Sequence, residues 1–248
     1  MAACDFNDPS SLDSAFKGAS GIFSVNDFWV YFRNAGKRGE AEAKGENWCA
    51  LSRDNDTQEI KNISDAASSV PTLEPFVLAS MANSNKLSGA KYAECYHFEG
   101  KTIAEDYSQR KELSGAQSGR FASVGKLPVV RSHCDTDVLV AGLLRSPPGQ
   151  RVIGNREWLT LVDITKILAE LVDATDVEVS SEPVSSDMGD PLVTTDNMHM
   201  IGFSAEFGYD GHLAGNEVTE PSKLGISLPS VKEWFQQQDW ASKIQIVE

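Results

Sequence analysis

The chain has 248 residues, enough for one large domain or two small ones, and 36 acidic residues outnumber 22 lysines and arginines. The formal net charge of −14 would repel phosphate backbones and anionic lipid, which argues against direct binding to nucleic acid or a membrane surface. Apolar runs such as residues 138–144 are far shorter than the roughly 20 residues that span a bilayer, so no transmembrane helix is expected. The acidity is local, because residues 159–220 hold 13 acids against one base, and the remainder holds 23 acids against 21 bases.

The amino terminus and the cysteines indicate a soluble intracellular protein. Met-Ala-Ala-Cys-Asp lacks the basic and apolar regions of a secretory signal. The four cysteines contain no Cys-x-x-Cys pair, which suits reduced thiols better than a disulfide framework or a zinc site. We therefore expect a cytoplasmic protein, with the nucleus as a second location for a regulator.

The first part of the chain predicts alternating helices and strands. Asp8 and Pro9 are typical of an N-cap and a first helical position. Residues 21–26 form a short apolar run that ends in polar residues, which is typical of a buried strand whose carboxyl end faces a site. Residues 33–55, rich in glycine, alanine and charge, predict an exposed loop, and a helix is expected over residues 57–69.

The alternation continues through the rest of the chain. The next predicted elements are a strand at residues 75–80, a helix at 98–107, a loose connection at 111–126, a strand at 127–130 and a helix at 135–144. Residues 160–163 and 230–233 fit the capping-box pattern and predict the starts of two further helices. Because strands alternate with helices, the predicted fold class is α/β.

Common catalytic motifs are absent. The sequence contains neither a Walker lysine loop nor a Gly-x-Gly-x-x-Gly turn. Residues 202–206 nearly match a nucleophile elbow, but Glu206 stands where the second glycine is needed. The four histidines lack metal-ligand spacing, so no metal site is expected. Tyr96 and Lys101 are five residues apart rather than the four of a helical Tyr-x-x-x-Lys pair, and His97 occupies the tyrosine's place.

Two blocks, residues 5–29 and 71–101, carry a resemblance to a known family. The first reads DFNDPSSLDSAFKGASGIFSVNDFW, and the second contains PTLEPFVLAS, KLSGAKY and HFEGK. With weaker matches at residues 158–160, 224–226 and 239–240, the chain resembles the NmrA-like proteins, an atypical branch of the short-chain dehydrogenase superfamily. The resemblance implies an incomplete Rossmann-like, doubly wound parallel sheet with a smaller, acidic C-terminal α+β region for substrate or partner.

The same resemblance implies how the chain is divided and what it lacks. Residues 1–158 would form a truncated NAD(P)-binding region and residues 159–248 the C-terminal region, interleaved into effectively one domain. The chain would begin at the end of the family's third strand, without the glycine-rich turn that holds the pyrophosphate and chooses between NAD and NADP. A second gap is expected within residues 110–126, where the family has its sixth strand. The family's fourth strand would then be an exposed apolar edge.

Site residues also follow from the resemblance. The matched positions are Asp5 and Phe6 at the adenine, Asn26, Asp27 and Phe28 beside the adenine ribose and the nicotinamide, and Lys101 at the nicotinamide ribose. Lys101 is the one catalytic candidate, because an ammonium can donate to two ribose hydroxyls. The ordinary alternatives are a helix-approach residue for Asp5, a turn former for Asn26 and a solvated charge for Lys101.

Three functions remain open at the level of sequence. The first is an NAD(P)H-dependent oxidoreductase acting on a small molecule, such as a tailoring reductase of secondary metabolism, with NADP favoured over NAD by the resemblance. The second is a non-enzymatic NAD(P) sensor that binds a regulatory protein. The third is a chain that binds no dinucleotide, because the glycine-rich segment is missing.

Overall fold

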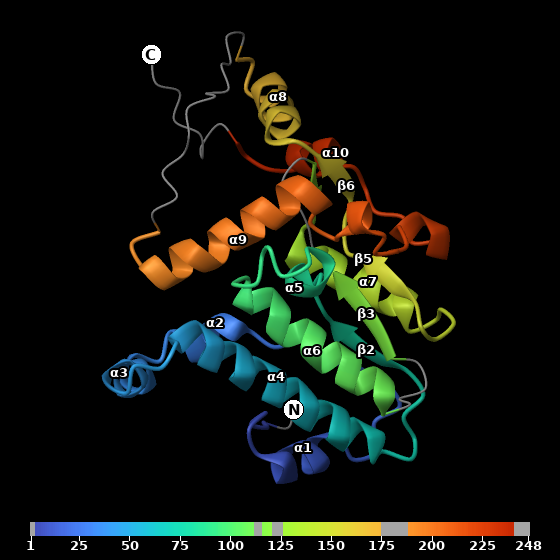
Figure 1. Cartoon of the computed structure of the whole chain (residues 1–248). Helices are drawn as coiled ribbons and strands as arrows, with labels where there is room; N and C mark the ends of the chain where they lie inside the picture. Colours follow the sequence, from blue (N-terminus) through green and yellow to red (C-terminus); the bar gives the residue numbers. More distant parts are fainter. Residues whose placement is uncertain (1–2, 112–115, 121–125, 175–187, 241–248) are drawn as a thin grey trace.

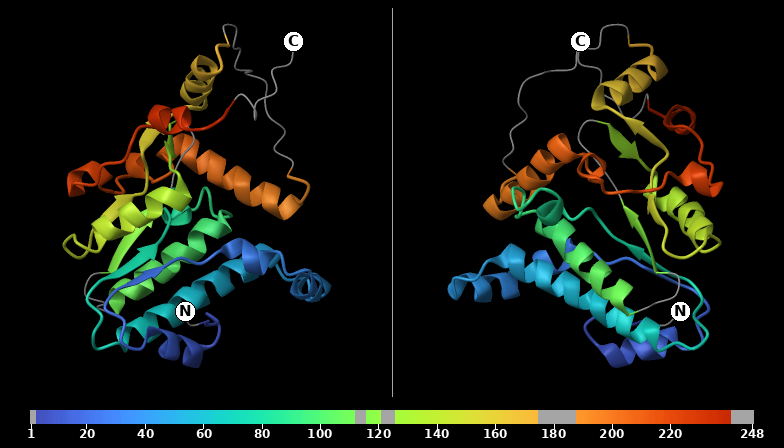
Figure 2. Two further views of the ribbon diagram at one scale, coloured as in Figure 1. Left: turned by 180° about the vertical axis from the view of Figure 1, so that it is seen from behind. Right: turned by 45° about the vertical axis from the view of Figure 1, so that its right-hand side comes forward.

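The structure is a computed structural model, and it describes residues 3–111, 116–120, 126–174 and 188–240. A parallel sheet lies at its centre, helices pack along it, and the C-terminal segments gather around one end (Figures 1 and 2). The strands are β1 (Ile22–Ser24), β2 (Phe76–Ala79), β3 (Ala116–Arg120), β4 (Leu127–Val129), β5 (Arg151–Ile153) and β6 (Glu157–Leu159). The helices are α1 (Pro9–Phe16), α2 (Phe28–Phe32), α3 (Ala35–Ala43), α4 (Trp48–Ser68), α5 (Ser84–Leu87), α6 (Tyr96–Arg110), α7 (Ser132–Leu143), α8 (Leu161–Leu171), α9 (Pro191–Phe207), α10 (Val231–Gln236) and the short 3₁₀ turns η1 (His212–Ala214) and η2 (Pro221–Leu224).

The central sheet has the strand order β1-β2-β3-β5, and all its pairs are parallel. Val152 of β5 also bridges Thr219 in parallel, so the segment before η2 extends this edge of the sheet. β4 and β6 form a separate antiparallel pair. The α/β class is confirmed. The boundary expected between residues 158 and 159 falls within β6, and the division into two regions stays a prediction.

Alternating side chains of β2 build a core on each face of the sheet, because successive strand residues point to opposite faces. Phe76 and Leu78 pack with residues of α1, α4 and α6, among them Leu12, Ile60, Ile63 and Ala104. Val77 points the other way and packs with Leu143 of α7 and Val152 of β5. The sheet therefore lies between α4 and α6 on one face and α7 on the other, which is the layering of a doubly wound fold.

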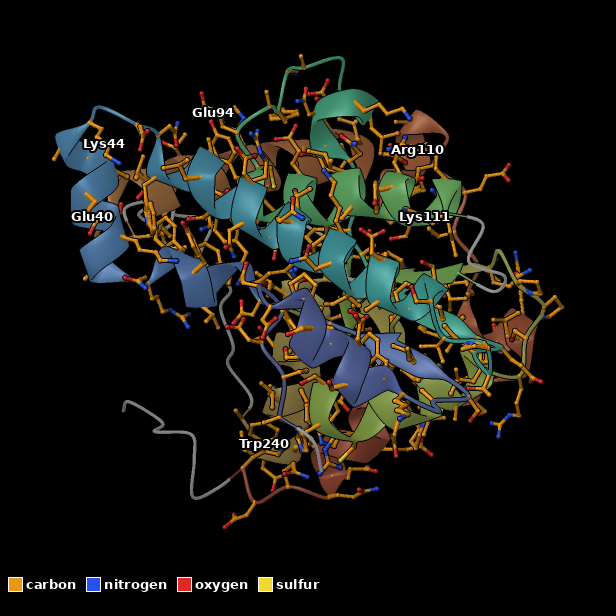
Figure 3. The ribbon with its side chains drawn as sticks, turned by 90° about the horizontal axis from the view of Figure 1, so that it is seen from below. Glu40, Lys44, Glu94, Arg110, Lys111 and Trp240 are labelled. Atoms are coloured by element: carbon orange, nitrogen blue, oxygen red, sulfur yellow. The ribbon has the colours of Figure 1, made fainter. Side chains whose placement is uncertain are left out.

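Residues 33–55 are mostly helical, so the prediction of an exposed loop was wrong. Asn34 and Asn47 cap α3 and α4 by accepting backbone amide hydrogens, and the fully buried Trp48 donates its indole N–H to the carbonyl of Phe32 at 2.8 Å. The exposed side chain of Glu40 leaves α3 away from the body of the molecule (Figure 3). The composition did not predict these helices, because alanine and charged residues are common both in solvated helices and in loops.

β3 lies between β2 and β5 at residues 116–120, where the sequence predicted a loose connection and a missing strand. Both predictions were wrong there, and the remainder of residues 112–125 lies outside the described residues. The segment reads Ala-Gln-Ser-Gly-Arg, without an apolar run. Backbone pairing to two neighbouring strands defines it as a strand, and hydrophobic periodicity carries no information about that pairing.

β1 is an edge strand within the described part of the chain, as the sequence predicted. It pairs with β2 alone, and Phe23 and Val25 leave 39% and 55% of their surface exposed on one face. Both predicted capping boxes are present, at Thr160 before α8 and at Ser230 before α10. In the described residues, no helix combines the length and the apolar character needed to cross a membrane.

Candidate functional site

Lys101 and Asn26 meet at the carboxyl end of β1. The ammonium nitrogen of Lys101 lies 2.9 Å from both the backbone carbonyl and the side-chain oxygen of Asn26, and 3.2 Å from Oδ1 of Asp56. The amide nitrogen of Asn26 donates to the same carboxylate at 2.7 Å. Three polar side chains from β1's end, α4 and α6 therefore form one hydrogen-bonded cluster, the Lys101 cluster.

The Lys101 cluster is buried. Asp56 is 1% exposed and Asn26 is 6% exposed, while the Lys101 side chain keeps 13% of its surface accessible. Burial raises the pKa of Asp56 to about 6, although the neighbouring Lys101 charge opposes the rise. A carboxyl that titrates near neutral pH beside a partly accessible ammonium is typical of a functional site, and it also occurs in structural ion pairs.

Asp27 and Phe28 follow Asn26 and serve α2. The carboxylate of Asp27 accepts the backbone N–H of Trp29 at 3.0 Å and caps the helix. Phe28 is 2% exposed and packs with Phe32 and Trp48. The carboxylate of Asp27 is accessible to a ligand, whereas Phe28 is enclosed in the core. The roles of both residues beside a dinucleotide remain predictions.

Glu59 of α4 links the segment that contains Asp5 and Phe6 to the Lys101 cluster. Glu59 accepts from Asn7 at 3.0 Å and from Asn26 at 3.4 Å, so it joins the two segments that the resemblance assigned to one ligand. Asp5 is exposed and accepts the Asn7 backbone N–H at 2.9 Å. Phe6 is half-buried against the core.

These groups suit one end of a nicotinamide dinucleotide better than the other. Ribose hydroxyls can donate to carboxylates and accept from an ammonium, and the cluster supplies both kinds of group. A pyrophosphate at this end of β1 would instead be repelled by the accessible carboxylate of Asp27 and by Glu59. The described residues at this end of β1 include no glycine-rich turn that could oppose these charges. The residues present therefore fit the nicotinamide ribose and disfavour the phosphates.

One helical turn before Lys101, His97 is held by Asp196 of α9. The His97 Nδ1 contacts the Asp196 carboxylate, which also accepts the backbone N–H groups of Tyr96 at 2.7 Å and His97 at 3.3 Å. A side chain from a distant helix thus satisfies the amino terminus of α6. The Cys95 thiol, the imidazole and the carboxylate have ligand atoms within 4.8 Å of one another, a grouping that the sequence spacing did not reveal. Burial and the Asp196 charge raise the pKa of the Cys95 thiol far above its usual value, so the thiol is protonated.

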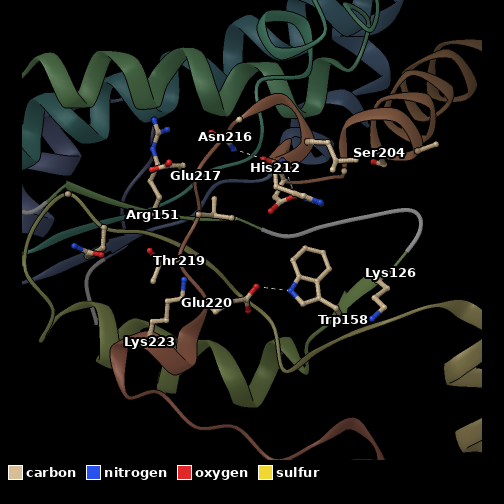
Figure 4. Close-up of a pocket in the computed structure, with 18 residues that line it drawn as sticks. Lys126, Arg151, Trp158, Ser204, His212, Asn216, Glu217, Thr219, Glu220 and Lys223 are labelled. Carbon is tan, nitrogen blue, oxygen red and sulfur yellow. Dashed lines mark hydrogen bonds and ion pairs between the residues drawn. The ribbon is translucent and has the colours of Figure 1, made fainter.

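A second candidate site is a cleft of about 1210 Å³ beside β5 (Figure 4). Its walls come from Lys126 next to β4, the start of β5, β6, α9 and the segment from Gly208 to Lys223. The side chains that reach it include Lys126, Arg151, Trp158, His212, Glu217, Glu220 and Lys223. The cleft therefore combines an indole, an imidazole and charges of both signs.

His212 in this cleft is paired with a buried carboxylate. Its Nδ1 lies 2.6 Å from Oδ1 of Asp210, whose side chain is 3% exposed, while the His212 side chain is 52% exposed. On the β6 wall, the indole N–H of Trp158 donates to Glu220 at 2.9 Å (Figure 4). The imidazole and the indole both border the same open space.

Glu105 of α6 connects the two sites. His97, Lys101 and Glu105 follow at intervals of four residues and lie on one face of the helix. The carboxylate of Glu105, which is 3% exposed, accepts from Ser80 at 2.6 Å and pairs with Arg151 of the cleft wall at 2.9 Å. Lys101 therefore lies one helical turn from Glu105, and Glu105 forms an ion pair with Arg151 in the wall of the cleft.

Three buried carboxylates of these sites, Asp56, Asp196 and Asp210, were not predicted from the sequence. Asp56 gave a signal, because it falls four residues before Ile60 on the inward face of α4. Asp196 and Asp210 lie in the acidic stretch, where nothing in the sequence separates a buried carboxylate from a solvated one. The near match to a nucleophile elbow is helical instead, and Ser204 donates to the Met200 carbonyl at 2.7 Å.

Comparisons with known proteins place the fold. No family model and no curated protein matches the sequence. The crystal structure of NmrA, a negative transcriptional regulator, superimposes with a TM-score of 0.64 at 13% identity, over 96% of this chain and 81% of that one. The chain has the same fold as NmrA. The resemblance in sequence is thereby confirmed at the level of the fold.

Further solved structures share this NmrA-like architecture. NmrA in complex with NADP matches with a TM-score of 0.62 at 14% identity, over 93% of this chain and 77% of that one. A nucleoside-diphosphate-sugar epimerase from Staphylococcus aureus matches with a TM-score of 0.55 at 13% identity, over 94% and 82%. Vestitone reductase from alfalfa (Medicago sativa L.) matches with a TM-score of 0.50 at 12% identity, over 70% and 66%. At such identities the matches describe the fold, which regulators and enzymes share.

Proposed function

We propose that the chain is an NAD(P)-binding oxidoreductase that acts on a small molecule. The observation that carries this proposal is the position of Lys101, whose ammonium is held 2.9 Å from two oxygens of Asn26 at the carboxyl end of a parallel strand. Ligands of open α/β sheets bind outside the carboxyl ends of the strands. The solved complex of NmrA with NADP has the same fold and supports the same choice of ligand.

Lys101 and Asn26 would hold the nicotinamide ribose in this proposal. The ammonium faces four oxygens, so it has to release at least one of them to donate to a ribose hydroxyl. Asp56 then keeps the ammonium directed toward the carboxyl end of β1. The nicotinamide, when bound, supplies or accepts a hydride, and the cleft beside Arg151 and Trp158 receives the substrate. The resemblance favours NADP over NAD.

Calorimetric titration with NADPH, NADH and their oxidised forms tests this proposal. We expect heat of binding for at least one dinucleotide and a clear loss of affinity in Lys101→Ala. Lys111→Ala is the matched control, because Lys111 also belongs to the α6 region but lies exposed at the far end of the helix (Figure 3). Absence of heat with all four dinucleotides, or equal affinity of Lys101→Ala and the wild type, would contradict the proposal.

A non-enzymatic dinucleotide sensor that binds a regulatory protein is the second candidate. Two observations favour it: His97 replaces the tyrosine of the helical Tyr-x-x-x-Lys pair, and the neighbour NmrA is a negative transcriptional regulator. A sensor would bind NADPH without consuming it across a panel of quinones, enones and ketones. The third alternative, no dinucleotide binding, is supported by the carboxylates of Asp27 and Glu59 near the carboxyl end of β1, which would repel phosphates, and the same calorimetry decides it.

A further inference from the structure

We propose that the cleft is the substrate site for a planar aromatic ketone, and that His212, positioned by Asp210, transfers the proton. This inference rests on the proposed oxidoreductase function and adds the substrate class and the acid–base group. It is carried by one arrangement: an exposed imidazole fixed by a buried carboxylate, in the same cleft as an indole.

Asp210 fixes which nitrogen of His212 is available. Its buried carboxylate lies 2.6 Å from Nδ1, which leaves Nε2 on the accessible edge of a ring that is half exposed. The backbone N–H of His212 also donates to Asp210 at 3.3 Å, and Asn216 donates to the Asp210 carbonyl. A carboxylate that orients an imidazole from behind is the arrangement by which proteins position a general acid or base.

The backbone around the dyad is shaped to hold the imidazole. Gly208 and Gly211 have φ values of +73° and +74°, a region that favours glycine. A Cβ at position 208 would lie 2.5 Å from both Cε1 and Nδ1 of His212, so a side chain there would displace the ring. The absence of a side chain at position 208 therefore makes room for the His212 ring beside the turn.

Trp158 gives the cleft a flat apolar surface. Its indole N–H is already satisfied by Glu220 at 2.9 Å, which fixes the ring and leaves its face for stacking. The charged side chains of the cleft, Lys126, Arg151, Glu217, Glu220 and Lys223, balance closely in sign, and this favours a neutral ligand over a strongly charged one. A planar ketone can stack on the indole while its oxygen accepts from Nε2 of His212.

Reduction of the ketone requires one hydride and one proton. A hydride from NAD(P)H adds to the carbonyl carbon, the pair of electrons of the C=O π bond moves to oxygen, and oxygen takes a proton from Nε2 of protonated His212. The products are the secondary alcohol, the oxidised dinucleotide and neutral His212. The imidazole regains its proton from water through its exposed edge, and Asp210 neither gains nor loses a proton in the step.

Binding is tested first, without turnover, using 9-fluorenone as the probe. Carbethoxylation of each histidine is followed by peptide mass spectrometry with and without the ketone. We expect 9-fluorenone to slow the modification of His212 and to leave exposed His133 of α7 unchanged as the internal control. Trp158→Ala should weaken binding of the ketone by about tenfold, as lost aromatic stacking predicts. Equal modification of His212 with and without 9-fluorenone would overturn the site.

Turnover is tested with NADPH and 9-fluorenone. We expect His212→Gln to lower kcat by roughly 10²- to 10⁴-fold with little change in KM, and added imidazole to restore part of the rate. His133→Gln should match the wild type, and retained NADPH affinity in His212→Gln separates this proposal from the role of Lys101. An unchanged kcat in His212→Gln would reject the acid–base role. Protection of His212 in a wild-type protein that consumes no NADPH with 9-fluorenone would reject reduction of the planar ketone. Only the further absence of NADPH consumption across the panel of quinones, enones and ketones would reject the proposed oxidoreductase function.

Discussion

Asp56 should make the protein less stable as the pH rises, which is the reverse of the usual behaviour of a paired carboxylate. Its pKa is about 6 in the folded protein and near 3.8 in the unfolded chain, so the folded state binds its proton more tightly. Stability from this group is therefore complete below about pH 4 and is lost as the pH rises through 6. At about 1.36 kcal/mol per unit of pKa difference, the loss amounts to about 3 kcal/mol.

Urea unfolding of the wild type and Asp56→Asn between pH 4 and pH 7 measures this loss. The asparagine does not titrate, so the free energy of unfolding of the wild type should fall by about 2 kcal/mol relative to the variant across this range, because Asp56 of the unfolded chain is already partly ionised at pH 4. Asp65→Asn is the matched control on the same helix, because the Asp65 side chain is 48% exposed and its pKa is lowered rather than raised. Parallel pH profiles for the wild type and Asp56→Asn would refute the raised pKa of the buried Asp56 carboxyl.

Two further predictions concern packing and charge. Arg156→Met should cost about 3–5 kcal/mol of unfolding free energy in urea, because it removes the two 2.6 Å hydrogen bonds that Arg156 donates to the 1% exposed Asp135 and leaves that carboxylate with the one from the Arg131 backbone N–H; a cost below 1 kcal/mol would contradict this. Gly202→Ala should lower Tm, since its Cβ would lie 2.4 Å from the Tyr92 ring, whereas Gly39→Ala in α3 meets open space and should stabilise by about 1 kcal/mol. Equal shifts in Tm for the two glycine variants would refute the packing of α9.

Local sequence rules predicted those elements whose signals are local. The Asp8-Pro9 cap, the two capping boxes and the apolar run of β2 each place a helix start or a strand within one or two residues. β3 gave no such signal, because its strand character comes from pairing with β2 and β5. The long α4 was predicted only in its second half, since the buried residues of its first half after Trp48 and Cys49 are the polar Ser52 and Asp56.

The same distinction between local and tertiary signals applies to the residues of the candidate site. Lys101 and Asn26 are 75 residues apart in sequence, and the family resemblance alone selected both. Their contact is a geometric fact of the structure, and their role toward a dinucleotide stays a prediction. Helical spacing from Ile60 could have pointed to Asp56, whereas Asp210 could not be selected, because burial of a carboxylate depends on tertiary partners. The His212–Asp210 dyad in particular needs the glycine turn around Gly208 and the cleft, both of which are products of the fold.

A crystal structure of the chain grown with NADPH tests the central claim most directly. We expect electron density for the nicotinamide ribose at the carboxyl end of β1, with a hydroxyl within hydrogen-bond distance of the Lys101 ammonium and the nicotinamide directed toward the cleft that contains His212. Dinucleotide density at another place, or none at a concentration that saturates the calorimetric signal, would contradict the account.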